Sequence, residues 1–253
     1  MGDDIRTMDW HVTARTRTPY VRVYTEEKDR AVLLVVDQRL NMFFGTRDRL
    51  KSVTAAQLAA LGAWRALDVG DRVGIVAFDD ETLFEMPPRR SEQNVMSILN
   101  GVLEMNHALH AESGVHPAPG MLNTALEKAM RLAKHDMLVV IVSDFFGIDE
   151  QTSKLTARIS THNDILGILV HDPMRLDPPT GRFRASDGEN QLEIDLDDTQ
   201  LRERLVEDYR DEQERISRFL RRLSAPLLMI SNEGDVVSQV RRLLGVAPVP
   251  NNG

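Results

Sequence analysis

The chain has 253 residues, 42% of them hydrophobic and 28% charged, a composition that excludes a disordered, collagen-like or low-complexity protein. It has no cysteine, which excludes disulfides and cysteine nucleophiles and is compatible with a reducing compartment. The net charge of −8 argues against general nucleic-acid binding. No apolar run approaches the roughly 20 residues of a membrane-spanning helix, and the first residues lack a secretory-signal pattern. We therefore expect a soluble, cytoplasmic protein with no membrane-inserted segment and no nucleic-acid partner.

Short apolar runs alternate with amphipathic stretches, the pattern of a mostly parallel α/β sheet covered by helices on both faces. We predict strands at residues 31–36, 72–78, 137–143, 165–171 and 226–230. The predicted helices are residues 48–67, 91–109, 121–134, 198–223 and 235–244. Thr46 is the predicted N-cap of the first helix, and the first strand should lie in the middle of the sheet.

Two segments depart from this alternation. Residues 82–86 predict an antiparallel edge strand, because the preceding connection is too short for a crossover helix, and Pro87-Pro88 should end it. Residues 172–198 predict an inserted polar hairpin. We expect one domain over residues 31–245, preceded by an arm (1–30) in which Trp10 covers an apolar edge and followed by a flexible tail (246–253).

Two acidic residues suggest where a site would lie. Asp37 and Asp144 each follow an apolar strand, and ligands of open α/β sheets gather at the carboxyl ends of strands near the topological switch point. Two carboxylates on neighbouring strand tips would be about 5–10 Å apart, close enough to share a cation. Each residue alone also fits a strand-end turn with no function.

These residues resemble a von Willebrand factor A-like domain, whose metal-ion-dependent adhesion site is Asp-x-Ser-x-Ser after the first strand, a Thr in a middle loop and an Asp after the fourth strand. More specifically, the chain resembles the bacterial family called domain of unknown function 58. The motifs that carry this resemblance span residues 2–10, 14–15, 24–27, 37–46, 70–74, 143–145 and 172–178, and Arg175 stands where the family usually has Glu. Family members usually have several tens of residues before the first motif, some with membrane helices, so we expect Met1 to mark a truncated chain or an alternative start.

The resemblance implies a Rossmann-like fold, but the metal ligands are altered. Arg39 and Asn41 stand at the two serine positions and Gly120 at the threonine position. Asp37, Asn41 and Asp144 could still offer oxygens to Mg²⁺. The positive charge of Arg39 would oppose the ion if it points inward, because a pair of unit charges 4 Å apart interacts by about 4 kcal/mol at an effective dielectric constant of 20. We predict that these five residues form a vestigial metal-site loop, with no cofactor and no tightly bound ion. If Arg39 points to solvent, weak Mg²⁺ binding survives.

The resemblance further implies a non-enzymatic protein-interaction domain that cooperates with an AAA+ ATPase of the MoxR type in assembling or maturing an unknown client protein. The predicted surface combines residues 37–46, 113–120 and 144–148. Its apolar anchors are Met42, Phe43, Phe44, Phe145 and Phe146, of which two or three should instead point into the core. The alternatives are a metal-dependent hydrolase using Asp37 and Asp144, and a structural scaffold in a membrane-associated complex.

Other clusters favour ordinary structural roles. His107, His110 and His116 have no acid to complete a zinc ligand set. The arginines at 215, 218, 221 and 222 are flanked by acids and predict a solvated helix face. The chain contains neither a phosphate-binding glycine loop nor a Gly-x-Ser-x-Gly motif, so no enzymatic activity is predicted.

Overall fold

A computed structural model describes residues 30–108, 115–186 and 191–245. The strands are β1 (Ala31–Asp37), β2 (Arg72–Phe78), β3 (Leu83–Arg89), β4 (Met137–Ser143), β5 (Asp164–His171), β6 (Arg182–Ser186), β7 (Gln191–Asp195) and β8 (Leu227–Ser231). The helices are η2 (Leu40–Met42), α2 (Lys51–Asp68), α3 (Glu92–Ala108), α4 (Met121–Leu132), α5 (Glu150–Ser160), η3 (Pro173–Arg175), α6 (Thr199–Arg222) and α7 (Val236–Leu243). The predicted arm before Arg30, with Trp10, and the predicted tail lie outside the described residues.

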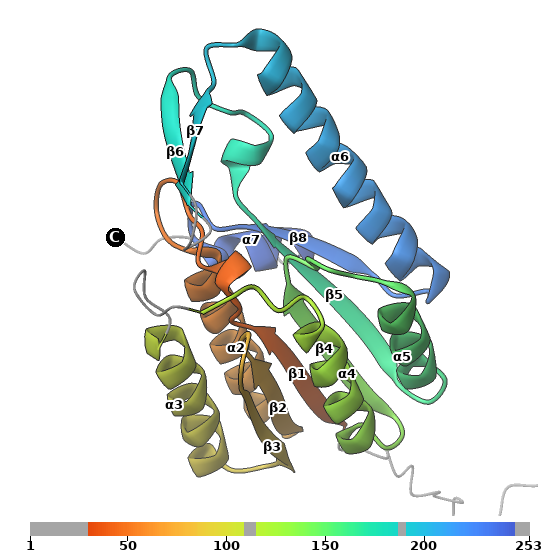
Figure 1. Ribbon diagram of the computed structural model, residues 1–253. Helices are drawn as coiled ribbons and strands as arrows, with labels where there is room; N and C mark the ends of the chain where they lie inside the picture. The colour runs from red at the N-terminus through yellow and green to blue at the C-terminus, as the bar shows by residue number, and fades with distance from the viewer. Residues whose placement is uncertain (1–29, 109–114, 187–190, 246–253) are drawn as a thin grey trace, which may run out of the picture.

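Six strands form one sheet in the order β3-β2-β1-β4-β5-β8, as Figure 1 shows. β1 pairs in parallel with β2 and β4, and β5 and β8 continue the parallel arrangement. β3 pairs antiparallel with β2 at the edge. The central position of the first strand and the antiparallel edge strand are therefore confirmed.

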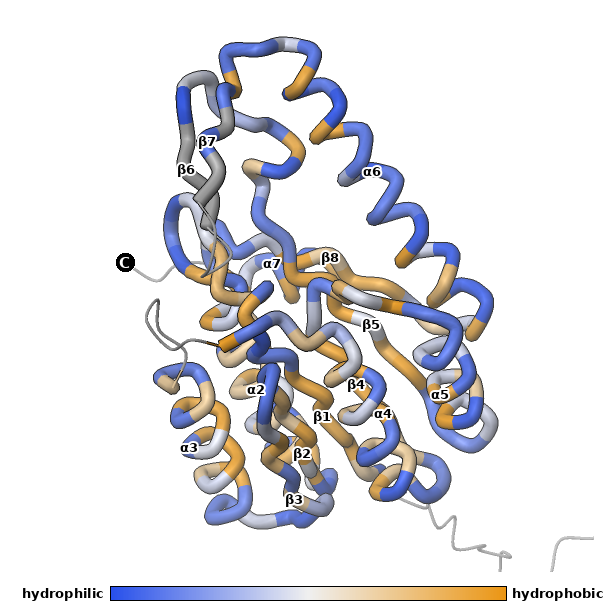
Figure 2. The backbone as a smooth tube through the Cα atoms, viewed as in Figure 1, coloured by the Kyte–Doolittle hydropathy of each residue, from blue (hydrophilic) through white to orange (hydrophobic). Residues whose placement is uncertain are grey.

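Alternating side chains of the sheet build one core on each face. Leu33 and Val35 of β1 pack with α4, α5 and the C-terminal half of α6, whereas Leu34 and Val36 pack with α2, α3 and α7. Figure 2 shows hydrophobic residues along the central strands. β1 is buried on both faces, which agrees with its continuous apolar run from Ala31 to Val36.

The first helix starts later than predicted. α2 begins at Lys51, with Leu50 as an N-cap that makes no side-chain capping bond. Thr46 is not the N-cap; its hydroxyl donates to Asp172 Oδ1 at 2.7 Å, and the two residues are 126 positions apart in the chain. The local sequence favours a cap at Thr46, but a long-range carboxylate binds this hydroxyl instead.

The prediction that Pro87-Pro88 ends the edge strand is wrong. β3 continues through both prolines to Arg89, and the pairing with β2 shifts at a bulge between Val73 and Ile75. Gly74 lies at this bulge, where an added Cβ would lie 2.6 Å from the Met86 carbonyl oxygen. An edge strand tolerates proline, because the N–H groups on its outer side have no partner strand to bind. The absence of a side chain at Gly74 lets the β3 backbone come close to β2 at the bulge.

The predicted hairpin is present as the antiparallel pair β6–β7, inserted between β5 and α6. α6 begins at its Asp198 N-cap, and its N-terminal half extends beyond the sheet in Figure 1. Arg175 connects η3 to this half: its guanidinium lies 4.1 Å from the Tyr209 ring centre and 2.8 Å from Glu212. Within the described residues, no helix has both the length and the apolar character needed to cross a bilayer.

Candidate functional site

The switch point of the sheet lies between β1 and β4. The connection after β1 leads to α2 on one face, and the connection after β4 leads to α5 on the other, so the two loops diverge at the strand ends, where open α/β sheets bind their ligands. The register pairs Val36 with Val142, which brings the next residues, Asp37 and Ser143, side by side. The Ser143 hydroxyl donates to Asp37 Oδ2 at 2.6 Å.

Arg39 points inward and forms a buried ion pair with Asp37. The backbone N–H and Nε of Arg39 donate to Asp37 Oδ1, each at 3.0 Å, and Nη2 donates to Oδ2 at 2.7 Å. Both side chains have no solvent exposure. The guanidinium also lies 5.3 Å from the centre of the buried Phe78 ring. The alternative in which Arg39 points to solvent is therefore wrong.

The same guanidinium contacts two other loops. Nη1 donates to the Pro119 carbonyl at 3.1 Å, and Nη2 donates to the Phe146 carbonyl at 3.1 Å. Burial alone would lower the pKa of Arg39, but Asp37, followed by Asp144 and Asp80, raises it above its usual value. The guanidinium therefore stays charged inside the protein.

A second buried pair lies beside the first. Lys51 Nζ donates to Asp144 Oδ2 at 2.6 Å, and the side chains are 6% and 10% exposed. Asn41 Nδ2 and the Phe146 backbone N–H donate to Asp144 Oδ1 at 2.7 and 3.0 Å. Burial would raise the pKa of Asp144, but the charge and hydrogen bond of Lys51, with the amide of Asn41, hold it below the ordinary value.

Four of the five predicted site residues thus form two adjoining networks, Asp37 with Arg39 and Asn41 with Asp144. Gly120 is placed differently. It precedes α4 as the N-cap and follows Pro119, whose carbonyl contacts Arg39, but a Cβ added at Gly120 would meet no atom within 4 Å. Gly120 therefore borders the site and contributes no group to it.

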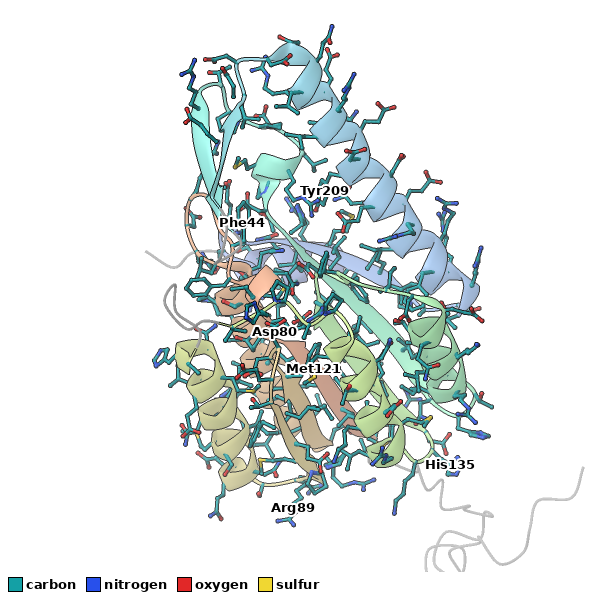
Figure 3. All side chains as sticks on the ribbon, in the orientation of Figure 1. Phe44, Asp80, Arg89, Met121, His135 and Tyr209 are labelled. Atoms are coloured by element: carbon teal, nitrogen blue, oxygen red, sulfur yellow. The ribbon has the colours of Figure 1, made fainter. Side chains whose placement is uncertain are left out.

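The five predicted anchors divide by exposure. Met42 and Phe145 are buried, at 0% and 1% exposure, and belong to the core, so they are not surface anchors; they are among the two or three expected to point inward. Phe43 is partly buried. Phe44 and Phe146 are each 41% exposed and lie on the loops that follow β1 and β4. Figure 3 shows Phe44 near Asp80 at the carboxyl edge, with Arg89 and His135 at the opposite edge.

Sequence reasoning missed Lys51 and Asp80. Asp80 follows β2 and accepts hydrogen bonds from the backbone N–H groups of Leu40, at 2.5 Å, and Ala118, at 2.6 Å. It therefore ties the β1 loop to the loop before α4. Part of its signal was present, because Asp79 and Asp80 both follow the apolar strand β2. Lys51 had no such signal, since it lies in a stretch with several basic residues.

These residues do not fit a divalent cation. All four carboxylate oxygens of Asp37 and Asp144 already accept hydrogen bonds, and two of their donors carry full positive charges. Mg²⁺ needs oxygen ligands at about 2.0–2.1 Å in near-octahedral geometry. Here the positions around Asp37 are filled by the nitrogen donors of Arg39 and by the Ser143 hydroxyl instead.

A third polar cluster fastens the outer part of the same edge. Asp172 is fully buried; Oδ1 accepts from the Thr46 hydroxyl and the Met174 N–H, and Oδ2 accepts from the Thr46 N–H and Asn232 Nδ2. Burial would raise the pKa of Asp172, but the hydrogen bonds from Asn232 and Thr46 lower it. This cluster joins the β1 loop to the ends of β5 and β8.

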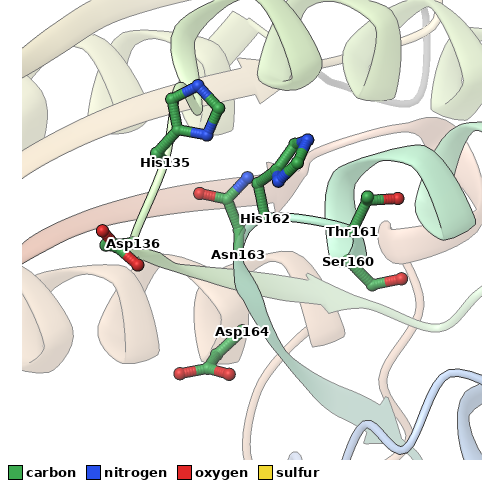
Figure 4. Close-up of a pocket in the computed structure, with 7 residues that line it drawn as sticks. All are labelled: His135, Asp136, Ser160, Thr161, His162, Asn163 and Asp164. Carbon is green, nitrogen blue, oxygen red and sulfur yellow. The ribbon is translucent and has the colours of Figure 1, made fainter.

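A separate surface pocket of about 460 Å³ lies at the amino edge of the sheet (Figure 4). His135 and His162 meet there edge to face, with ring centres 4.7 Å apart. The other lining residues are Asp136, Ser160, Thr161, Asn163 and Asp164. In the described part of the chain, no group of three or more His, Cys, Asp or Glu residues is arranged to hold a metal ion.

Several solved structures resemble this chain. BatB from Bacteroides thetaiotaomicron is 12% identical, with a TM-score of 0.52 over 85% of this chain and 97% of that one. An aerotolerance-related membrane protein from Bacteroides fragilis is 14% identical, with a TM-score of 0.50 over 83% of this chain and 95% of that one. The SpRpn10 VWA domain matches with a TM-score of 0.44, at 10% identity over 87% of this chain and 98% of that one.

The six-stranded sheet, its single antiparallel edge strand and its covering helices make this a von Willebrand factor A-like domain. Residues 1–215 match the family described as Protein of unknown function DUF58, and the chain belongs to that family. Uncharacterized proteins from Mycobacterium tuberculosis and Mycobacterium bovis are each 29% identical over 245 residues, which cover 96% of this chain and 75% of theirs.

Proposed function

We propose that this domain is a non-enzymatic protein-interaction module that binds its partner through the carboxyl edge of the sheet. Two exposed aromatic side chains on the switch-point loops, Phe44 and Phe146, carry this proposal. Aromatic residues on otherwise polar surfaces often dominate binding energy. Their backbones are coupled, because the Phe44 carbonyl accepts from Lys51 N–H, and Lys51 and Phe146 N–H both contact Asp144.

The partner we propose is an AAA+ ATPase of the MoxR type, with which the domain would assemble or mature a client protein. This part of the proposal comes from the family resemblance. We also propose that the domain lies in the cytoplasm, and its cysteine-free composition is compatible with that compartment. We further propose that the altered adhesion site is degenerate and that the domain needs no cofactor.

Binding to the MoxR-type ATPase encoded nearest to this chain tests the proposal. By biolayer interferometry, Phe44→Ala and Phe146→Ala should each weaken binding about 30-fold, corresponding to about 2 kcal/mol, with no matching fall in melting temperature. Trp64→Ala, which removes a 40% exposed aromatic on α2, is the matched control and should bind normally. Unchanged affinity in both phenylalanine variants would move the interface to the hairpin or α6.

The hydrolase alternative requires Asp37 and Asp144 to leave their cationic partners. A phosphatase and esterase screen with Mg²⁺ and Mn²⁺ tests it. We expect no turnover. Turnover lost in both Asp37→Asn and Asp144→Asn, while each variant keeps its circular dichroism spectrum, would overturn the binding proposal.

A further inference from the structure

We infer that the Arg39 guanidinium is an internal cation that holds three loops of the carboxyl edge in one arrangement without a metal ion. The loops are the segment after β1, the segment before α4 and the segment after β4. Arg39 belongs to the first and contacts Pro119 in the second and Phe146 in the third. It is a positioning residue, since it would act on a partner through the loops that it fixes.

The surroundings of the guanidinium are those of a cation. Its nitrogen atoms are bonded to oxygens alone: the two carboxylate oxygens of Asp37 and the carbonyl oxygens of Pro119 and Phe146. Carboxylate and carbonyl oxygens are also the ligands of hard divalent cations. The planar fork reaches them at 2.7–3.1 Å, and because it is covalently attached, it cannot be removed by chelation.

The charge balance of the edge supports the same inference. Arg39 and Lys51 bring two positive charges beside three carboxylates, those of Asp37, Asp80 and Asp144. Loss of Arg39 would leave one cation beside three carboxylates. Such a site, in a partly buried setting, attracts a divalent ion much more strongly than the wild-type edge does.

This inference deepens the proposed function, because a prearranged edge would present Phe44 and Phe146 to a partner even in the presence of a chelator. Its test needs no partner, so the two can fail separately. If the ATPase does not bind while the loop test succeeds, only the proposed function is wrong.

Hydrogen–deuterium exchange of the whole chain, with and without EDTA, is the test. The wild type should be indifferent to EDTA. In Arg39→Met, residues 115–120 and 144–148 should exchange about tenfold faster or more, because the carbonyls of Pro119 and Phe146 lose the guanidinium that donates to them. Arg65→Met is the control: Arg65 forms an ion pair of the same 2.7 Å length with Asp68, but on the surface. It should leave both segments unchanged.

A second arm tests the cationic role itself. We expect calorimetry to detect Mn²⁺ binding to the Arg39→Ser variant. We also expect Mn²⁺ to slow exchange in the same two segments of this variant. Neither effect should follow if Arg39 only fills space. If the buried Asp37 charge prevents the single variants from folding, Arg39→Met with Asp37→Asn removes both charges and should still show fast exchange at 115–120 and 144–148. Unchanged exchange in every folded Arg39 variant, or EDTA-sensitive loops in the wild type, would overturn the inference.

Discussion

Lys51, in the first turn of α2, and Asp144, just after β4, form an ion pair of 2.6 Å with side chains that are 6% and 10% exposed. They are 93 residues apart in the chain. Their contact fixes the start of a helix from one face of the sheet to the end of a strand whose own connection leads to the other face. The pair therefore joins the two loops that leave the switch point, beside the Arg39–Asp37 pair.

This pair predicts a pH-dependent effect of Lys51→Met. Because the folded pKa of Asp144 lies below its ordinary value, the carboxylate contributes stability above the unfolded pKa of about 3.9 and loses it as the pH falls through the folded value. At pH 7 the variant leaves a buried charge without its cation and should lose about 3 kcal/mol. The loss should shrink as the pH approaches about 4, because the variant's Asp144 protonates.

Urea denaturation of both proteins at pH 7, 5 and 4 measures this difference. Lys154→Met is the control, since its 2.7 Å ion pair with Glu150 is exposed. It should cost under about 1 kcal/mol at every pH. A loss for Lys51→Met that is equal at pH 7 and pH 4 would contradict the assignment.

Ser143→Ala should destabilise the protein by about 1–3 kcal/mol. The Ser143 hydroxyl donates to Asp37 and accepts from the buried N–H of Phe145 at 2.8 Å, so its removal leaves a buried donor unpaired. Ser153→Ala removes an exposed helix hydroxyl and is the matched control. Thermal denaturation at pH 7 compares them, and equal melting temperatures would show that the Asp37 network does not depend on Ser143.

Asp172→Asn should cost about 3 kcal/mol, although the two side chains have the same shape. Each carboxylate oxygen accepts from two of four donors. In asparagine one oxygen is replaced by an NH₂ group, which cannot accept, so two of the four donors would lose their acceptor. The loss should be accompanied by faster amide exchange at Thr46, whose N–H and hydroxyl both contact Asp172. Wild-type stability in this variant would mean that the loop is held elsewhere.

Gly101→Ala should have opposite effects in two backgrounds. In the wild type an added Cβ would lie 2.3 Å from the Phe84 ring, and this overpacking should outweigh the roughly 1 kcal/mol of helix propensity gained, for a net loss of about 1 kcal/mol. With Phe84→Ala the clash is absent, so the same change should stabilise by about 1 kcal/mol. A double-mutant cycle by chemical denaturation detects the reversal of sign, and additive effects would contradict it.

Much of the fold could be predicted from local pattern. The apolar runs at 72–78 and 137–143 coincide with β2 and β4, because a strand buried on both faces has no alternative to a short, continuous apolar run. Asp37 and Asp144 could also be assigned to the carboxyl edge, because each follows such a strand and strand direction follows from the order of strands and helices.

The exposure of individual loop side chains could not be predicted from local pattern. Phe145 and Phe146 are adjacent and equally hydrophobic, yet one is 1% exposed and the other 41%. Phe145 has a left-handed backbone, with φ of 58°, and this turn sends the two rings in different directions. Which ring enters the core depends on the helices packed around the loop, and these come from distant parts of the chain.

The sequence by itself determined the strands, the two apolar faces and the set of acids at the strand ends, because these depend on the period of a local pattern. Only the tertiary structure decided which cation meets which carboxylate. Arg39 could have pointed to solvent, but its charge is stable inside because Asp37, Pro119 and Phe146 surround it with oxygens. Such an environment is assembled from three loops far apart in sequence, so its energy is defined only once the chain has folded.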